Sequence, residues 1–272
     1  MNAGPVALTV WGCRGSLPVP GPGTAEFGGD TTCYDICSAA RRIIIDCGSG
    51  LRALGEAMMA EGPPAEIDLL LTHPHFDHLI GLGFFAPLIA QTSRVRLWTA
   101  LPAPRVLEAL YRLYSPPLWP VMIPGNFPIT VEQIPPEGMV LDAFSIGLLP
   151  LNHPGGSVGF RIEIDGKRIC IVTDHEHGDA AIDAALIRAI AGADLLLIDA
   201  AYSPEEYPQR RGWGHSSWPE AHAIGAHGEV AQTLIVHHSP GAKDADLLAA
   251  EAQFDQSLGP VSFARDRMTI TL

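Results

Sequence analysis

The sequence has few basic residues: 17 Lys and Arg stand against 30 Asp and Glu among 272 residues, a formal net charge of −13 at pH 7. It contains no block of Lys and Arg, and its densest basic points are the pairs Arg41-Arg42 and Arg210-Arg211. Such a surface repels the phosphate backbone of a nucleic-acid polymer at long range, so we expect no such partner. A small anion can still bind where metal ions dominate the local field. We therefore expect a small-molecule substrate.

The sequence also lacks paired cysteines and long apolar runs. Its five cysteines form no Cys-x-x-Cys pair, which argues against a disulfide framework and favours a reducing compartment. The longest apolar stretch, around Leu195–Ile198, is too short to span a bilayer. The segment Met1–Pro5 shows neither the basic region nor the apolar region of a signal peptide. These absences predict a soluble, cytoplasmic protein without a membrane partner.

Hydrophobic residues are abundant, at 47% of the chain, and no linker or short repeat divides it, which predicts one domain over residues 1–272. Patterns typical of strands alternate with helical patterns, which predicts a layered α/β architecture in two similar halves. Helices are expected at 51–60, 79–90, 104–114, 180–190, 218–228 and 244–256. Strands are expected at 6–11, 34–37, 42–46, 67–71, 95–98, 129–133, 145–151, 159–164, 168–173, 195–199 and 234–237. The oligomeric state stays open, a homo-oligomer included.

Four side chains that can bind metal follow the apolar strand that ends at Leu71, all within six residues: His73, His75, Asp77 and His78. Imidazole and carboxylate are common ligands of zinc and similar divalent ions. Residues 73 and 75 can converge on one ion from a tight turn, while residues 77 and 78 can face a second. The alternative is a polar turn without function, but four such groups at this spacing favour a metal site.

This pattern, H-x-H-x-D-H directly after an apolar strand, resembles the hallmark of the metallo-β-lactamase superfamily, whose fold is a four-layer αββα sandwich. The superfamily's remaining ligand positions are matched in order, each at the end of an expected strand, by His153, Asp174 and His237. The resemblance implies a dinuclear site of two divalent ions. It places His73, His75 and His153 on one metal, Asp77, His78 and His237 on the second, and Asp174 between them. Zinc is expected first, although manganese or iron also suits these ligands.

The later positions each have a competing interpretation. His153 alone can be a residue that caps a turn at a strand end. Asp174 is followed by a His-Glu-His run, and its place at the strand end favours it over those neighbours. His237 and His238 are adjacent, so only one can bind the metal directly. The match to the superfamily's last strand end favours His237 and leaves His238 as a candidate for substrate binding.

Two positions indicate the branch of the superfamily. Classical β-lactamases of this fold mostly have a cysteine where Asp174 stands, and a redox di-iron branch has a carboxylate where His75 stands. The resemblance therefore implies a hydrolytic site. The Gly- and Pro-rich loop from Trp11 onward, followed by Gly-Gly-Asp-Thr-Thr at 28–32, is similar to the N-terminal loop of the phosphodiesterase and tRNase Z-like branch. That branch includes bacterial cyclic-nucleotide phosphodiesterases, and Asp30 departs from its usual Asn.

A second stretch, Gly-Trp-Gly-His-Ser-Ser at 212–217, resembles the His-Ser-Thr element of the same branch, with Ser217 in place of Thr. The resemblance implies that His215 protonates the leaving group, partnered by an upstream acid for which Asp199 and Glu205 are the candidates. A bystander role for His215 beside a helix cap is the alternative.

Together these motifs imply a phosphodiesterase that attacks a small phosphodiester, such as a cyclic nucleotide, with a metal-bridging hydroxide. Asp77 is expected to orient that hydroxide as well as bind metal. The side chains expected to contact substrate are Arg14, Thr31, Thr32 and His238. tRNase Z activity itself is disfavoured, because the chain is acidic and has no basic arm. The alternatives are hydrolysis of a carboxylic ester, lactone or thioester, and a metal-binding module without activity.

Overall fold

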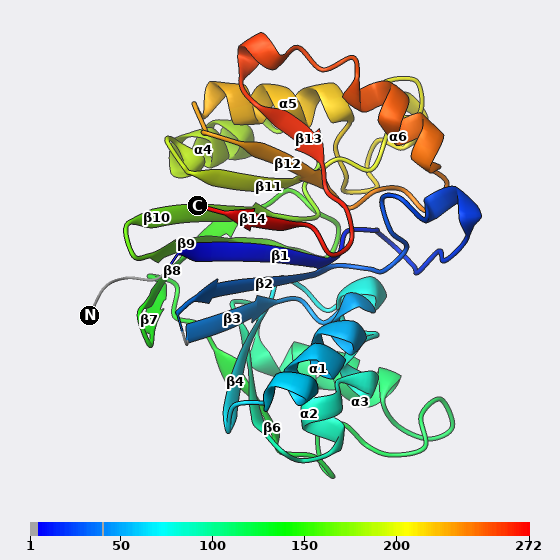
Figure 1. Cartoon of the computed structure of the whole chain (residues 1–272), viewed down its shortest axis with the longest axis vertical. Coiled ribbons are helices and arrows are strands. Elements are labelled where there is room, and N and C mark those ends of the chain that lie inside the picture. Colours follow the sequence, from blue (N-terminus) through cyan, green and yellow to red (C-terminus); the bar gives the residue numbers. More distant parts are fainter. Residues whose placement is uncertain (1–4, 40) are drawn as a thin grey trace.

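Two sheets of seven strands face each other in the computed structural model, which describes residues 5–39 and 41–272 (Figure 1). The first sheet has the order β14 (Thr269–Thr271), β1 (Val6–Gly12), β2 (Cys33–Ser38), β3 (Arg41–Ile45), β4 (Glu66–Leu71), β5 (Arg94–Thr99) and β6 (Ile129–Gln133). The second has the order β13 (Val261–Phe263), β12 (Thr233–Val236), β11 (Leu195–Asp199), β10 (Lys167–Val172), β9 (Val158–Ile164), β8 (Phe144–Pro150) and β7 (Met139–Leu141).

Helices cover the outer face of each sheet (Figure 1). The first sheet carries α1 (Gly50–Glu61), α2 (Ala86–Ile89) and α3 (Ala103–Leu113), and the second carries α4 (Ala180–Ile190), α5 (Trp218–His227) and α6 (Asp244–Glu251). Short 3₁₀ turns lie at Pro22–Thr24, Phe76–His78, Leu82–Phe84, Tyr207–Gln209 and Gln256–Leu258. The layers therefore run helix, sheet, sheet, helix, and the expected αββα sandwich is confirmed.

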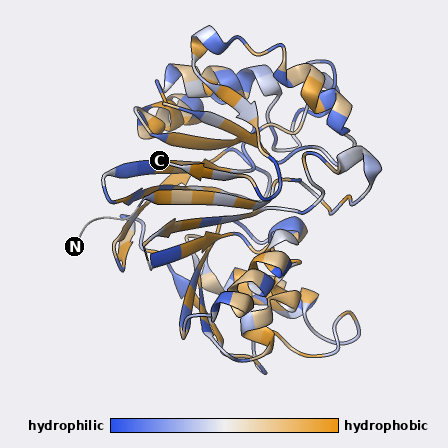
Figure 2. Ribbon diagram, in the orientation of Figure 1, coloured by the Kyte–Doolittle hydropathy of each residue, from blue (hydrophilic) through white to orange (hydrophobic). Residues whose placement is uncertain are grey.

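Buried apolar side chains form three layers of core, and successive residues of one strand enter different layers. In β3, Ile43 and Ile45 lie in the core between the sheets, while Ile44 packs under the helices of the first sheet. In β11, Leu197 lies between the sheets and Leu196 packs under α4 and α5. Because both faces of these strands are buried at this level, the residues there are apolar in an unbroken run, Ile43–Ile45 in β3 and Leu195–Ile198 in β11. Figure 2 shows hydrophobic residues along the strands of both sheets.

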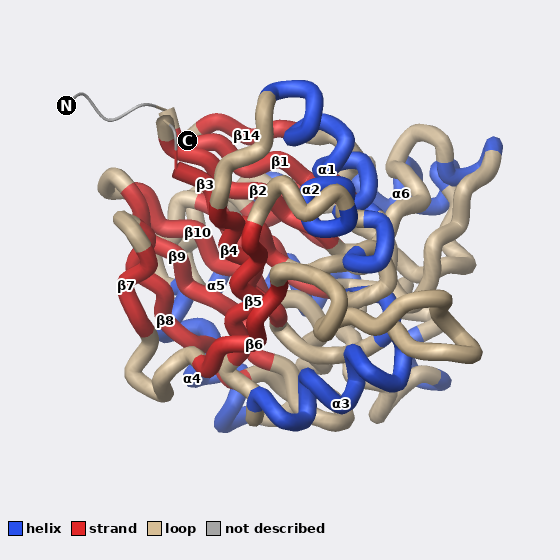
Figure 3. Tube along the Cα trace, turned by 90° about the horizontal axis from the view of Figure 1, so that it is seen from below, coloured by secondary structure: helices blue, strands red, loops and turns tan. Residues whose placement is uncertain are grey.

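Each half of the chain joins antiparallel strands to parallel ones. Strands β1 to β3 and β8 to β10 are antiparallel, whereas β3 to β6 and β10 to β13 are parallel. Parallel strands within a sheet all end at the same edge, so the segments that follow them meet there. Figure 3 shows the long loops collected at one side of the strands. The polar residues expected at strand ends lie in these loops.

The structure differs from the expected elements in a few places. The helix expected at 79–90 is only the 3₁₀ turn Leu82–Phe84 followed by the single turn of α2, because Gly81, Gly83 and Pro87 interrupt the helical backbone. The strands β7, β13 and β14 have three residues each and were not expected. Within the described part of the chain, no helix is long and apolar enough to cross a membrane.

Candidate metal centre

The turn after β4 carries His73, His75, Asp77 and His78, which lie at the edge of the sandwich. The 3₁₀ turn Phe76–His78 directs Asp77 and His78 inward, where both are buried. Asp46, directly after β3, accepts hydrogen bonds from the backbone N–H and hydroxyl of Thr72 at 2.9 and 3.0 Å. Its other carboxylate oxygen lies 2.8 Å from Nδ1 of His78. Asp46 thereby fixes the orientation of the His78 ring and leaves Nε2 free to face the cluster.

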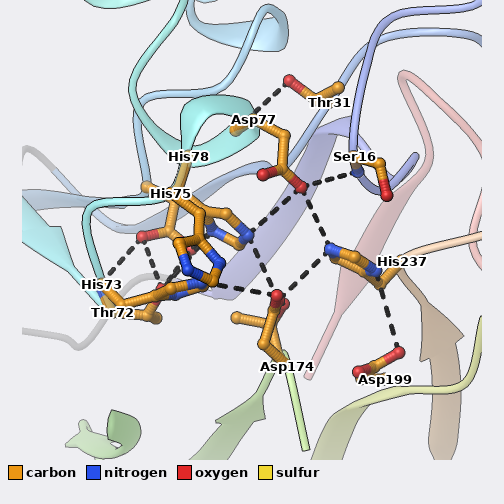
Figure 4. A network of polar contacts seen from close by, with 12 residues as sticks. Ser16, Thr31, Thr72, His73, His75, Asp77, His78, Asp174, Asp199 and His237 are labelled. Carbon is orange, nitrogen blue, oxygen red and sulfur yellow. Dashed lines mark hydrogen bonds and ion pairs between the residues drawn. The ribbon is translucent and has the colours of Figure 1, made fainter. Parts of the chain in front are cut away.

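Asp174, at the end of β10, stands at the centre of the cluster, with its two oxygens facing two different sets of histidines (Figure 4). Oδ2 lies 3.5 Å from Nε2 of His73 and 3.6 Å from Nε2 of His153. Oδ1 lies 3.2 Å from Nε2 of His78 and 3.3 Å from Nε2 of His237. The structure therefore brings His73 and His153 to one oxygen of Asp174, and His78 and His237 to the other.

The remaining two residues extend each side of the cluster. Nδ1 of His75 lies 3.1 Å from Nε2 of His153, on the Oδ2 side of Asp174. Oδ2 of Asp77 lies 3.1 Å from Nε2 of His237 and also accepts a hydrogen bond of 2.7 Å from the backbone N–H of Ser16. Three groups of ligand atoms within 4.8 Å of one another result. One holds His73, His75, His153 and Asp174, the second holds Asp77, His78 and His237, and the third joins Asp174 and His237 to Asp199 and His215.

The donor set fits divalent metal ions. Nε2 of His73 and of His78 are buried, point into the cluster and have no hydrogen-bond partner in the described chain. Buried polar atoms are almost always satisfied, so two such atoms beside carboxylates fit a site that binds cations. Several imidazoles with bridging and terminal carboxylates are the ligands that zinc and similar ions take.

The histidines and carboxylates of the cluster shift one another's pKa values. Burial opposes ionisation of Asp174, but the charges of His237 and His78 outweigh it and hold its pKa well below the usual range. Burial likewise disfavours protonation of His237, yet Asp174 and Asp199 raise its pKa to about 9. Burial and the neighbouring His78 lower the pKa of His73, which keeps its ring neutral. Because only neutral imidazole and ionised carboxylate bind metal, metal binding here is expected to compete with protons.

His215 lies beside the cluster, next to two of its histidines. Its ring stacks on that of His237, with centroids 4.5 Å apart, and lies 5.3 Å from the ring of His153. Its Nδ1 lies 2.7 Å from Oδ2 of Asp199, the last residue of β11. Of the two acids expected as its partner, Asp199 is therefore the one that the structure brings to it. This contact leaves Nε2 of His215 as the nitrogen that can reach a substrate.

The four side chains expected to contact substrate are all fully buried in the structure. The guanidinium of Arg14 is buried and donates to the carbonyl oxygens of Gly28, Ser239 and Ala242 at 2.7, 3.1 and 2.8 Å. Arg14 thus ties the loop at Gly28 to the loop at Ser239 and Ala242, and its Nη2 lies 3.9 Å from Oδ1 of Asp244.

The other three side chains expected to contact substrate are buried inside the protein. The hydroxyl of Thr31 donates to the carbonyl oxygen of Asp77 at 2.8 Å, and Thr32 is fully buried. His238 directs Nε2 to the carbonyl oxygen of Ala264 at 2.8 Å, and burial lowers its pKa to about 3. Because His237 has φ of 62°, its side chain turns into the cluster while the next residue points the opposite way.

Glu176, which sequence reasoning did not single out, fastens the loop that carries His215. Its carboxylate accepts hydrogen bonds from the backbone N–H groups of Gly212 and Gly214, at 2.7 and 2.8 Å. The carbonyl oxygen of Gly214 in turn lies 2.9 Å from Nδ1 of His153. Gly214 has φ of 91°, and a Cβ there would lie 2.2 Å from the His153 ring. One carboxylate therefore positions both a histidine of the cluster and, through the next residue, His215.

Replacing Glu176 with Gln is expected to weaken metal binding about tenfold, the lower end of the range for an outer partner of a metal ligand. The amide nitrogen of Gln cannot accept from the backbone N–H groups that the carboxylate now binds, so the loop loosens behind His153. Competition with a chromophoric chelator measures the affinity. Glu206→Gln, an exposed change nearby, serves as the matched control. Unchanged affinity in a folded Glu176→Gln protein contradicts this role.

An αββα sandwich with a His- and Asp-rich cluster at the shared edge of its sheets is the metallo-β-lactamase fold. The chain belongs to the beta-lactamase superfamily domain family, whose model matches residues 41–238. This family includes metal-dependent hydrolases.

Similar proteins span nearly the whole chain. A ribonuclease Z of Bradyrhizobium sp. (strain ORS 278) is 27% identical over 289 aligned positions, which cover 86% of this chain and 91% of that protein. The metallo-β-lactamase fold protein YhfI from Bacillus subtilis superposes with a TM-score of 0.76 at 20% identity, over 98% of this chain and 100% of that one. A diphosphatase of the PhnP family superposes with a TM-score of 0.73 at 19% identity, over 98% of both chains. The structural similarities establish the fold.

Proposed function

We propose that this protein is a dinuclear metal-dependent phosphodiesterase that acts on a small phosphodiester such as a cyclic nucleotide. The observation that carries the proposal is Asp174, whose two carboxylate oxygens face two separate histidine sets. A carboxylate between two metal positions is the arrangement expected of a two-metal hydrolase.

In this proposal the cluster supplies both metal positions. His73, His75 and His153 would hold one ion and Asp77, His78 and His237 the second, with Asp174 shared between the two sets. Two divalent ions, zinc being the first expectation, would lower the pKa of water to about 7 and neutralise charge that develops on the phosphoryl oxygens.

The chain's own groups carry the remaining steps. Asp77, held by the backbone N–H of Ser16 at 2.7 Å, is placed to orient the attacking water through the oxygen that the Ser16 bond leaves free. His215, held by Asp199, donates a proton from Nε2 to the departing oxygen. The loop after β1 packs directly against the ring of His237: a Cβ at Gly15 would lie 2.2 Å from that ring. A bulkier residue there would displace His237 from the cluster.

The relatives named ribonuclease Z make RNA the competing substrate class. The charge of the chain favours the smaller one. With 17 basic residues against 30 acidic, a long polyanion is repelled over most of its length, whereas a small phosphodiester meets only the local field of the site. The same metal ligands can serve hydrolysis at phosphorus and at carbon, so turnover of substrates of both kinds has to distinguish the two.

The test is turnover by purified, metal-loaded protein on bis-p-nitrophenyl phosphate, cyclic AMP, a precursor tRNA and a homoserine lactone, with metal-stripped protein as the control. We expect hydrolysis of the two small phosphodiesters, little cleavage of the tRNA, and two equivalents of metal by elemental analysis. Turnover of the lactone alone, or of the tRNA in preference to cyclic AMP, overturns the proposal. Fewer than one equivalent of metal, with no activity after metal is added back, indicates a module without activity.

A further inference from the structure

Arg105, in the first turn of α3, lies near the exposed edge of the metal cluster. The point that a Cβ on Gly155 would occupy is 3.3 Å from Nη2 of Arg105 and 3.8 Å from Nε2 of His75. The guanidinium and the imidazole therefore approach the same point beside Gly155. His75 is exposed to solvent, in contrast to the buried His73 and His78, so this point is at the mouth of the cluster.

The loop between β8 and β9 runs past this point with two glycines. Gly155 and Gly156 have φ of 82° and 87°, a conformation that side chains rarely adopt, and they follow His153 directly. The backbone N–H of Gly156 closes the turn on the carbonyl oxygen of His153 at 2.9 Å. Because both residues are glycine, neither puts a side chain beside Arg105 and His75.

The guanidinium of Arg105 has no ion pair or hydrogen bond to any side chain or backbone group in residues 5–39 and 41–272. Arg112, two turns further along the same helix, is paired with Glu108 at 2.6 Å. Arg14, the charged contact expected from the sequence, is buried under the loops. Arg105 is thus a cation with its donors available beside the cluster of an otherwise acidic chain.

We propose that Arg105 binds an anionic oxygen of the substrate's phosphoryl group at the mouth of the cluster, on the side of His75, and so selects anionic phosphoesters. This inference rests on the proposed function and deepens it. The planar guanidinium presents parallel N–H groups that match two phosphoryl oxygens, and it stays charged at every pH of interest. Selection operates in binding: the arginine holds the oxygen that does not leave, while His215 serves the oxygen that does.

The test compares Arg105→Gln and Arg105→Lys with wild type, with Arg112→Gln as the matched control on the same helix. For bis-p-nitrophenyl phosphate we expect Arg105→Gln to raise KM roughly 10- to 100-fold, the loss expected for a hydrogen bond to a charged group, with little change in kcat. Arg105→Lys retains part of the affinity, because it keeps the charge and loses the fork. Arg112→Gln behaves as wild type.

Binding of inorganic phosphate to the metal-loaded proteins, followed by calorimetry, separates this inference from the proposed function. Arg105→Gln is expected to weaken phosphate binding by the same factor, and the difference from wild type is expected to shrink in high salt. If wild type hydrolyses no phosphodiester, the proposed function fails, yet phosphate binding still tests Arg105. Equal KM and equal phosphate affinity in wild type and Arg105→Gln overturn the inference. Because the side chain is exposed, its replacement is expected to leave the melting temperature unchanged.

Discussion

Replacing Asp174 with Asn is expected to weaken metal binding at both positions, to release metal from at least one of them, and to lower kcat/KM by more than 100-fold. Loss of a partner behind a metal ligand costs about 10- to 100-fold, and Asp174 faces both sets of histidines directly. An amide at this position has one oxygen, so at most one of the two sets keeps its carboxylate contact. Elemental analysis after gel filtration measures the stoichiometry, and bis-p-nitrophenyl phosphate hydrolysis measures the rate.

Asp77→Asn gives the contrasting result that distinguishes a bridging carboxylate from a terminal one. Asp77 approaches only the side of the cluster formed by His78 and His237, so its loss is expected to release one equivalent of metal and leave the other. Asp179→Asn is the control, since Asp179 caps α4 and Asn caps a helix equally well. If Asp174→Asn and Asp77→Asn lose the same single equivalent and bind the remaining one equally well, Asp174 does not bridge.

Residue patterns within short segments predict most of the fold and of the metal cluster. The turn 73–78 holds four metal-competent residues in one stretch, and the continuous apolar strands before Asp174 and His237 place those residues at strand ends. Parallel strands bring their ends to one edge, so sequence pattern and topology together suffice to gather the cluster. The same reasoning failed for the helix expected at 79–90, where two glycines and a proline outweigh the apolar pattern.

The residues that support the cluster were hidden from the sequence for a physical reason. Asp46 acts on His78, and Glu176 acts on the loop at Gly214, through contacts between segments that only the folded chain brings together. Arg105 has no motif, and its position depends on how α3 meets the loop after His153. The direction of the two adjacent histidine side chains also depends on the fold. Residues 237 and 238 are both histidine, and the backbone conformation at His237, with φ of 62°, turns that ring into the cluster.

Replacing His215 with Ala is expected to lower kcat for cyclic AMP by roughly 100- to 10,000-fold, the usual range for loss of a general acid. The departing ribose oxygen is a poor leaving group and needs a proton. The same variant is expected to hydrolyse bis-p-nitrophenyl phosphate nearly as well as wild type, because p-nitrophenolate departs as a stabilised anion. Asp199→Asn is expected to give a smaller loss with the same dependence on leaving group, since an uncharged amide holds the ring less firmly than the carboxylate now 2.7 Å away.

This comparison of leaving groups separates proton donation from a structural role. The His215 ring stacks on His237 at 4.5 Å, so its removal can also loosen a metal ligand. A loosened metal site slows both substrates equally, whereas a missing acid slows only the substrate whose leaving group needs the proton. His227→Ala, at the far end of α5, controls for removal of an imidazole elsewhere. Equal losses on the two substrates, with metal content reduced, assign His215 to the support of His237 and remove it from the chemical step.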